Sequence, residues 1–168
     1  MQNKIVVIVH NVRSCHNVGA ILRTADAFAI ERVFLTGYTP YPSGAPDDER
    51  LPHIANNATK LIHKTALGAE QSVEWRHQAD VDTVIKELKD NSYTVAAIEQ
   101  HSSSSPLPNV KSSEKIALLV GREVEGVEQD VLKSCDQIIE IPMFGAKESL
   151  NVAHAAAVAM YHCRFIST

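Results

Sequence analysis

The chain has 168 residues, of which 45% are hydrophobic and 21% are charged, and its formal net charge is −4. This length and composition predict a single globular domain over residues 1–168, large enough to bury its own core. The negative charge argues against a protein that coats nucleic acid indiscriminately, but it leaves room for a local basic face.

Neither export nor metal binding is indicated by the sequence. No apolar run approaches the length of a membrane span and the N-terminal stretch lacks a cleavage site, so we expect a cytoplasmic protein that does not contact a membrane. The cysteines Cys15, Cys135 and Cys163 are too widely spaced for a disulfide framework or a zinc site. The eight histidines form no metal-binding pair, so we expect no metal ion.

Short apolar runs alternate with helical patterns along the chain. Strands are predicted over 4–9, 33–36, 94–98, 115–120 and 138–141, and helices over 17–29, 56–66, 80–90, 128–135 and 150–165. The strand segments are continuously apolar, which is typical of strands covered on both faces in a parallel sheet. The alternation predicts an α/β fold with right-handed crossovers.

The first and last predicted helices have distinct surfaces. Helix 17–29 carries one apolar stripe, with Asn17 as its expected N-cap and Arg23 on a polar flank. The last helix, 150–165, is Ala-rich and apolar nearly all round. A helix without a polar face is usually buried on both sides, which suggests the sheet on one side and a second subunit on the other.

Two irregular segments interrupt the pattern. Residues 101–109 are rich in serine and proline and are interpreted as a surface connection. Residues 38–54 carry four prolines and are a candidate cover for a substrate, because long loops in compact domains are more often functional.

Three polar or glycine-bearing loops directly follow predicted strands, at 10–17, 121–127 and 142–149. In open α/β sheets, the carboxyl ends of the strands form the ligand crevice, so we expect these loops to converge on one site. The first strand is not followed by GxGxxG, and the loop from Gly121 to Gly126 lacks the Lys-Ser/Thr of a phosphate-binding loop. These features disfavour a Rossmann-type oxidoreductase.

The same loops carry a family resemblance. NVRSCHNVGAILRTADAF (11–28), LLVGREVEGV (118–127) and IEIPMFGAKESLNVAHAAAVA (139–159) resemble the three ordered motifs of the SpoU/TrmH methyltransferases. The resemblance implies an α/β fold of the SPOUT type, a parallel sheet flanked by helices whose C-terminal segment forms a deep trefoil knot. It also implies a homodimer that transfers a methyl group from S-adenosyl-L-methionine (SAM) to a ribose 2′-hydroxyl of RNA.

By this resemblance, five residues are candidates for catalysis: Arg23, Asn17, Glu123, Ser149 and Asn151. We interpret Arg23 as a phosphate clamp and charge stabiliser, because a guanidinium with a pKa above about 12 is a poor base. The simpler interpretation is a surface pair with Asp26, three residues along the helix. Asn17 and Ser149 could equally be helix caps, and Glu123 a solvated loop charge.

The resemblance also suggests ligand contacts. The candidate cofactor-binding residues are Leu119, Gly121, Ile141, Met143 and Leu150, whose apolar side chains would sandwich adenine while loop amides bond its edges. Ile141 and Leu150 are equally expected in the core. The candidate RNA-binding residues are Arg13, Arg122 and Lys147. Lys60 and Lys64 could also meet phosphates, but the simpler interpretation is the solvated face of a helix.

Two questions about function stay open at this level. No separate RNA-binding domain is expected before the first motif, which favours tRNA slightly over ribosomal RNA as the substrate. A non-catalytic RNA-binding module would be expected to lack the arginine or the polar pair of the third motif, and the presence of Arg23, Ser149 and Asn151 argues against it.

Overall fold

The computed structural model describes residues 3–46, 48–111 and 113–166. Within these residues, seven parallel strands form one sheet in the order β3-β2-β1-β6-β4-β7-β5. The strands are β1 (Lys4–His10), β2 (Arg32–Thr36), β3 (Trp75–Gln78), β4 (Thr94–Ile98), β5 (Ser105–Pro106), β6 (Lys115–Val120) and β7 (Gln137–Glu140). The helices are α1 (Cys15–Ala27), α2 (Pro52–Ala66), α3 (Ala69–Ser72), α4 (Val81–Asp90), α5 (Gln129–Ser134) and α6 (Val152–Tyr161).

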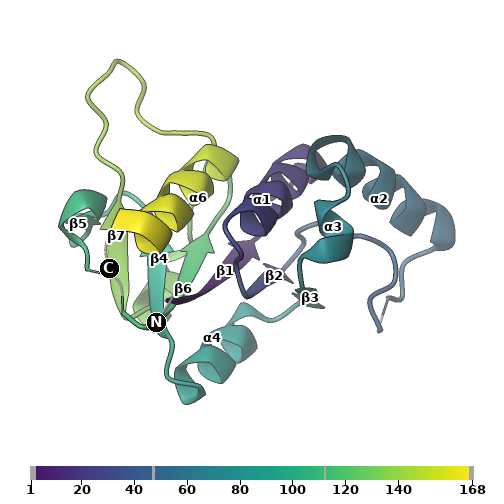
Figure 1. Cartoon of the computed structure of the whole chain (residues 1–168), viewed down its shortest axis with the longest axis horizontal. Helices are drawn as coiled ribbons and strands as arrows, with labels where there is room; N and C mark the ends of the chain where they lie inside the picture. Colours follow the sequence, from purple (N-terminus) through teal and green to yellow (C-terminus); the bar gives the residue numbers. More distant parts are fainter. Residues whose placement is uncertain (1–2, 47, 112, 167–168) are drawn as a thin grey trace.

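Helices cover both faces of the sheet, which confirms the expected α/β class. Along β1, Ile5, Val7 and Val9 join a core with α1, α2 and α6, whereas Val6 and Ile8 join a core with α4 and α5. Figure 1 shows α1 and α6 lying side by side across the sheet. Because successive side chains of a strand point to opposite faces, a strand between two helical layers must be apolar at every position.

The predicted elements are largely confirmed, and the differences lie at the edges. All five predicted strands are present, but β3 and β5 were not predicted. Both are edge strands with a single neighbour, and the sequence WRHQ of β3 carries no continuous apolar run. The loop predicted over 38–54 ends earlier, because α2 already begins at Pro52. A proline is tolerated at the first helical position, since the N–H that it lacks would have no partner within the helix.

The start of α1 also differs from the expectation. The helix begins at Cys15 and its N-cap is Ser14, whose Oγ accepts a hydrogen bond from the backbone N–H of Asn17 at 3.2 Å. The prediction that Asn17 caps this helix is therefore wrong. Its side chain, one turn inside the helix, is free to bond elsewhere.

Helices α1 and α2 cross at very short range. A Cβ at Gly19 would clash with the Ile62 carbonyl and with the Thr65 hydroxyl, so only glycine permits this approach. The Thr65 hydroxyl donates to the carbonyl of His16 at 2.8 Å, which fixes the crossing further. The packing therefore holds α2 in one orientation relative to the first turns of α1.

The C-terminal segment is anchored beside the start of the chain. After α6, a π-helical turn (η2, His162–Ile166) carries Arg164, which is buried and donates to the carbonyls of Phe28, Asn3 and Ala29 at 2.7–2.9 Å. Because each of the three guanidinium nitrogens donates to a backbone carbonyl, Arg164 holds η2 against the start of β1 and the end of α1.

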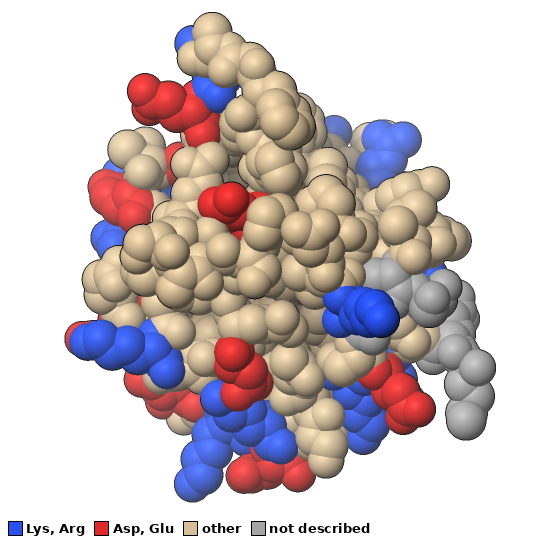
Figure 2. Space-filling model, turned by 90° about the vertical axis from the view of Figure 1, so that its left-hand side faces the viewer, with Lys and Arg blue, Asp and Glu red and all other residues tan. Residues whose placement is uncertain are grey.

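The outer side of α6 and η2 is apolar. Tyr161 and Phe165 are about half exposed, at 49% and 52%, and both pack edgewise against Phe28 of α1. Val158 and Ile166 are exposed beside them. Figure 2 views the molecule from the left-hand side of Figure 1 and shows mostly uncharged side chains over the middle of that side, with most of the charged ones around its rim. Among the described residues, no helix has the length and apolarity that a membrane span requires.

Candidate active site

The carboxyl ends of β4, β6 and β7 border a cavity of about 290 Å³. Its walls come from the residues after β4 (98–100), from the loop after β6 (120–126) and from the segment that runs from β7 into α6 (141–155). Two of the three loops expected to converge therefore do so around this cavity. The third, after β1, reaches it through hydrogen bonds described below.

One side of the cavity is apolar. Ile141, Met143 and Leu150 line it, as the sequence predicts, and Gly121 lies at its base. Leu119 does not line the cavity, and its side chain is fully buried in the core beneath α4 and α5. The expectation for Leu119 is wrong because successive side chains of a strand point to opposite faces, and the next residue, Val120, lines the cavity instead.

The loop after β6 is held in a tight reverse turn. Arg122 and Gly126 exchange backbone hydrogen bonds of 3.2 Å, and Gly126 has a φ of +69°. A Cβ at Gly126 would collide with the carboxylate of Glu99, which accepts from the backbone N–H groups of Val127 and Gln100 at 2.9 Å each. Glu99 was not identified from the sequence, because only the fold brings the end of β4 beside this loop.

A relay of side-chain hydrogen bonds joins the three motif loops. Asn17 Nδ2 donates to Glu123 Oε1 at 3.2 Å, and Asn151 Nδ2 donates to Asn17 Oδ1 at 3.1 Å. Asn151 is also the N-cap of α6, with its Oδ1 accepting from Ala153 N at 2.9 Å. Three of the five residues predicted as catalytic are thus brought together within this chain.

Glu123 also accepts hydrogen bonds from the two backbone amides that directly precede α1. Its carboxylate accepts from Arg13 N at 3.3 Å and from Ser14 N at 3.2 Å. Burial works to raise the pKa of Glu123, but hydrogen bonds from backbone amides and from Asn17 outweigh it and hold the pKa below its usual value. The carboxylate is therefore charged at neutral pH and complements the helix N-terminus.

Ser149 and Arg23 occupy different places. Ser149 is exposed and lines the cavity. Arg23 is exposed on α1, six residues beyond Asn17, or about 9 Å along the helix axis. Arg23 does not line the cavity, and it makes no ion pair with Asp26 within the described residues, since Asp26 instead accepts from the Ser72 hydroxyl at 2.6 Å. The guanidinium is thus open to an external partner.

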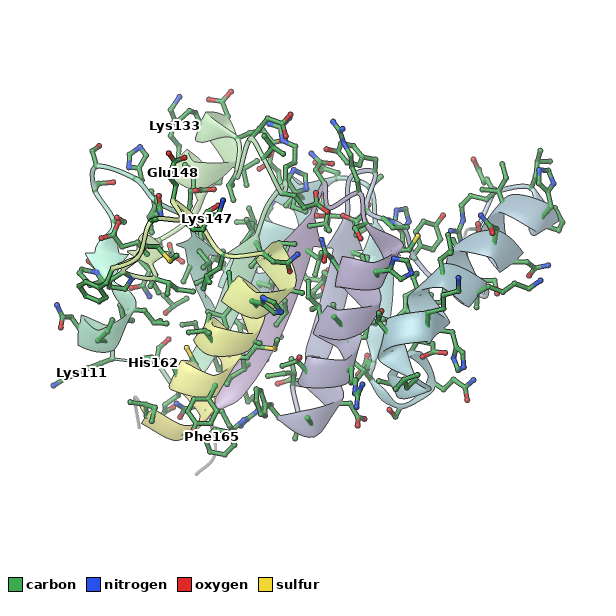
Figure 3. All side chains as sticks on the ribbon, turned by 90° about the horizontal axis from the view of Figure 1, so that it is seen from above. Lys111, Lys133, Lys147, Glu148, His162 and Phe165 are labelled. Atoms are coloured by element: carbon green, nitrogen blue, oxygen red, sulfur yellow. The ribbon has the colours of Figure 1, made fainter. Side chains whose placement is uncertain are left out.

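The predicted RNA-binding residues also separate into two kinds. Arg13 and Lys147 are exposed, Arg13 beside the Tyr38 ring at 6.0 Å and Lys147 on the loop that projects between β7 and α6 (Figure 3). Arg122 instead lies half-buried, with Nη2 at 3.3 Å from the carboxylate of Glu128. Arg122 therefore already has an internal partner, and its contact with RNA stays a prediction.

Glu128 belongs to a polar cluster beneath the loops that the sequence did not indicate. Its Oε1 accepts from Asn11 Nδ2 at 2.8 Å, and its Oε2 lies 3.4 Å from His10 Nε2. His10 is buried, and its Nδ1 pairs with the Thr36 hydroxyl at 2.8 Å. Burial lowers the pKa of His10, and the Glu128 carboxylate offsets this only in part. A neutral imidazole therefore sits between the ends of β1 and β2.

Comparison with known proteins gives a family match over most of the chain. Residues 4–161 match the model of the SpoU rRNA Methylase family. The chain is 31% identical over 157 residues to the 23S rRNA (guanosine-2'-O-)-methyltransferase RlmB of Bordetella pertussis, which covers 94% of this chain and 58% of that protein. It therefore spans less than two thirds of the length of that relative.

Solved structures share the fold. An AdoMet-bound rRNA methyltransferase from Sinorhizobium meliloti superposes with a TM-score of 0.78 at 21% identity, covering 98% of this chain and 57% of the other. A TrmH/SpoU tRNA modifying enzyme of A. aeolicus gives a TM-score of 0.78 at 23% identity, covering 97% and 75%. With its family model matched almost from end to end, this chain belongs to the SpoU rRNA methylase family.

Proposed function

We propose that this protein is a SAM-dependent RNA methyltransferase that modifies a ribose 2′-hydroxyl. The observation that carries the proposal is the relay from Glu123 through Asn17 to Asn151, which ties all three motif loops to the rim of one cavity. Family membership and the activity for which the Bordetella relative is named support the same reaction.

The cavity fits the proposed methyl donor. Ile141, Met143 and Leu150 offer an apolar wall for adenine, and the turn at Gly121 exposes backbone groups for its edges. SAM supplies an electrophilic methyl group when it is bound. Carboxylates from Glu99 and Glu148 also border the cavity and suit a ligand that carries positive charge.

The chain must position the hydroxyl and stabilise the negative charge that develops on its oxygen. We assign this to Arg23, which has no ion-pair partner among the described residues and can clamp a substrate phosphate next to the ribose. Ser149 and Asn151 lie at the rim, where they can hydrogen-bond the sugar. Because a guanidinium is a poor base, the proton passes to a phosphate oxygen or to water.

A homodimer accounts for the separation of Arg23 from the cavity of its own protomer. The exposed apolar side of α6 and η2, with Tyr161 and Phe165, is the proposed interface, since exposed apolar patches mark interaction sites. A second copy seated there would bring its α1 beside the first cavity, so that Arg23 serves the site of its partner.

The finer fold assignment is also a proposal. We propose that the segment from β7 through η2 is threaded as the trefoil knot of the SPOUT fold. The hydrogen bonds from Arg164 to the carbonyls of Asn3 and Ala29 support it, because they hold η2 beside the start of β1. Tracing this segment in an experimental electron-density map would decide the point.

The substrate class within RNA is assigned to tRNA, with ribosomal RNA as the competing candidate. The Bordetella relative is named as a methyltransferase of 23S rRNA, and the A. aeolicus enzyme is described as modifying tRNA. RNA is usually recognised through unpaired bases that can be splayed out, and the loops of tRNA expose such bases.

The role of Arg23 is tested by replacing it with alanine and measuring two quantities separately. We expect methyl transfer to RNA to fall at least about a hundredfold, in line with the loss of one charge-stabilising group. SAM affinity, measured by calorimetry, should change less than about threefold, because Arg23 does not line the cavity. Asp26→Ala, on the same exposed side of α1, is the control and should retain both activities.

Mixing variants tests the dimer. If Arg23 serves the partner, combining Arg23→Ala subunits with Asn151→Ala subunits should restore a fraction of the activity, since some mixed dimers hold one intact site. Full activity of Arg23→Ala alone would overturn its assignment. Failure of the mixture, with exchange of subunits verified, would overturn the shared site.

A further inference from the structure

Helix α2 carries an exposed polar stripe that the proposed site does not use. The helix has no Asp or Glu anywhere in its fifteen residues, although the chain as a whole has more acidic than basic side chains. His53, Asn57, Lys60 and Lys64 are spaced by four, three and four residues, so they follow one line along the helix. All four are exposed. We call them the α2 stripe, and it is about 16 Å long.

The α2 stripe lies on a rigid projection. Figures 1 and 3 show α2 extending outward from the rest of the molecule, with its first half farthest from the sheet. The second half is clamped against α1 by the close crossing at Gly19 and by the bond from Thr65 to His16. These contacts are made by the first turns of α1, the same end at which Ser14 meets Glu123. The stripe therefore projects from the catalytic edge.

The charges of the α2 stripe are not neutralised by the protein. Most basic side chains on the sheet edge and on α4 are in ion pairs, such as Arg32 with Glu74, Arg76 with Glu87 and Lys89 with Asp136. Lys60 and Lys64 have no ion pair within the described residues, and no carboxylate shares their helix. The exposed carboxylate of Glu49 precedes the helix.

Helix α2 has a second histidine, His63, which has an acidic partner and does not belong to the α2 stripe. His63 is bonded to Glu70 at 2.6 Å, which ties α2 to α3 rather than to an external ligand. The side chains along the α2 stripe, by contrast, are two ammonium groups, an amide and an imidazole. Groups of these types are the usual donors to phosphate oxygens in nucleic-acid complexes.

We propose that the α2 stripe binds the sugar–phosphate backbone of the RNA substrate, at a distance from the ribose that is methylated. The inference rests on the proposed function and extends it, because it assigns a second RNA contact surface outside the cavity. A rigid line of donors positions a phosphate backbone without reading sequence. It also gives a chain with net negative charge a local basic surface for a polyanion, since two exposed lysines without an ion pair in the described chain lie together on one projection.

The test is a charge reversal with a matched control. Lys60→Glu/Lys64→Glu removes the stripe's cations, and Lys86→Glu/Lys111→Glu reverses two other exposed lysines that have no ion pair within the described chain. Lys86 shares α4 with three carboxylates, so it should lie outside any RNA surface. The probes are total tRNA and ribosomal RNA from cells that lack this protein.

We expect the stripe variant to bind RNA at least about tenfold more weakly at low salt. The slope of log K against log salt should flatten by about 1 to 2, because each lost phosphate contact removes about 0.7–0.9 from the slope. The control should keep the wild-type affinity and slope. SAM affinity and thermal stability should be unchanged in both variants, which shows that the fold and the cavity are intact.

The outcomes separate this inference from the proposed function. If the wild type methylates RNA and the stripe variant binds RNA with an unchanged slope, the α2 stripe is not an RNA surface, while the proposed function stands. Equal weakening in the control would also overturn the inference, because net charge alone would then explain binding. If the wild type neither binds nor methylates either RNA, the proposed function fails and the inference fails with it.

Discussion

At the scale of single residues, the polar side chains of the site act through one another. Glu123 stabilises the N-terminus of α1, orients Asn17 and thereby reaches Asn151 on α6. The motif resemblance identifies all three, because each lies in one of the three motifs. Glu99 and Glu128 lie outside the motifs at 11–28, 118–127 and 139–159, and their contacts are with residues far away in the sequence.

The pH dependence of stability is expected to depend in part on His10. Its pKa is lowered by burial, so between its ordinary value of 6.5 and the lower folded value the unfolded chain binds a proton that the folded chain does not. Stability therefore rises with pH through this window and falls on acidification. Replacing His10 with Gln, which keeps a hydrogen-bonding side chain, should flatten this part of the curve.

Thermal unfolding from pH 7.5 to 5 measures the effect. The burial of His77 also lowers its pKa, so some slope should persist in His10→Gln and diminish further when His77→Gln is added. A pH profile of the double variant as steep as that of the wild type would show that these two imidazoles are not the groups that resist protonation.

At the scale of secondary-structure elements, the sequence predicts the strands that are buried on both faces. It does not predict the edge strands or the residue at which α1 begins. The strands β1, β4 and β6 are apolar at nearly every position because helices cover both faces, so their pattern is distinct. β3 is an edge strand and needs no such pattern. The true start of α1 was missed because Ser14 and Asn17 are both good capping residues, and only the path of the loop decides between them.

The turn after β6 should be sensitive to a single methyl group. Gly126→Ala introduces a Cβ that collides with Glu99 and forces a non-glycine residue to a positive φ, at a cost of roughly 1–3 kcal/mol in the free energy of unfolding. Displacing Glu99 should also disturb the cavity, so we expect SAM affinity, measured by calorimetry, to fall about tenfold or more.

Gly44→Ala is the control that distinguishes the effect of a positive φ from the effect of a collision with Glu99. Gly44 also has a positive φ, of +101°, but a Cβ there meets no atom within 4 Å. This control should lose some thermal stability and keep its SAM affinity. Equal losses of affinity in the two variants would contradict the role given to the Glu99 contact.

At the scale of the whole molecule, sequence patterns predicted the sheet class and the edge that holds the site. The placement of Arg23 could not be predicted, because a residue on the flank of a helix can serve its own cavity, that of a partner or neither. The apolarity of the last helix predicts a second contact surface, and this stays a prediction; Tyr161 and Phe165 are about half exposed there. That Lys60 and Lys64 have no ion pair within the described residues, unlike Arg32 and Arg76 at the sheet edge, is known only from the structure.

The most direct test of the account is the chemical identity of the product. The protein is incubated with methyl-labelled SAM and with tRNA and ribosomal RNA from cells that lack it, and the RNA is digested to nucleosides for mass spectrometry. We expect the label on a ribose 2′-oxygen of a defined nucleotide. A label on a base, or no label on either RNA by a folded protein that binds SAM, would contradict the proposed function.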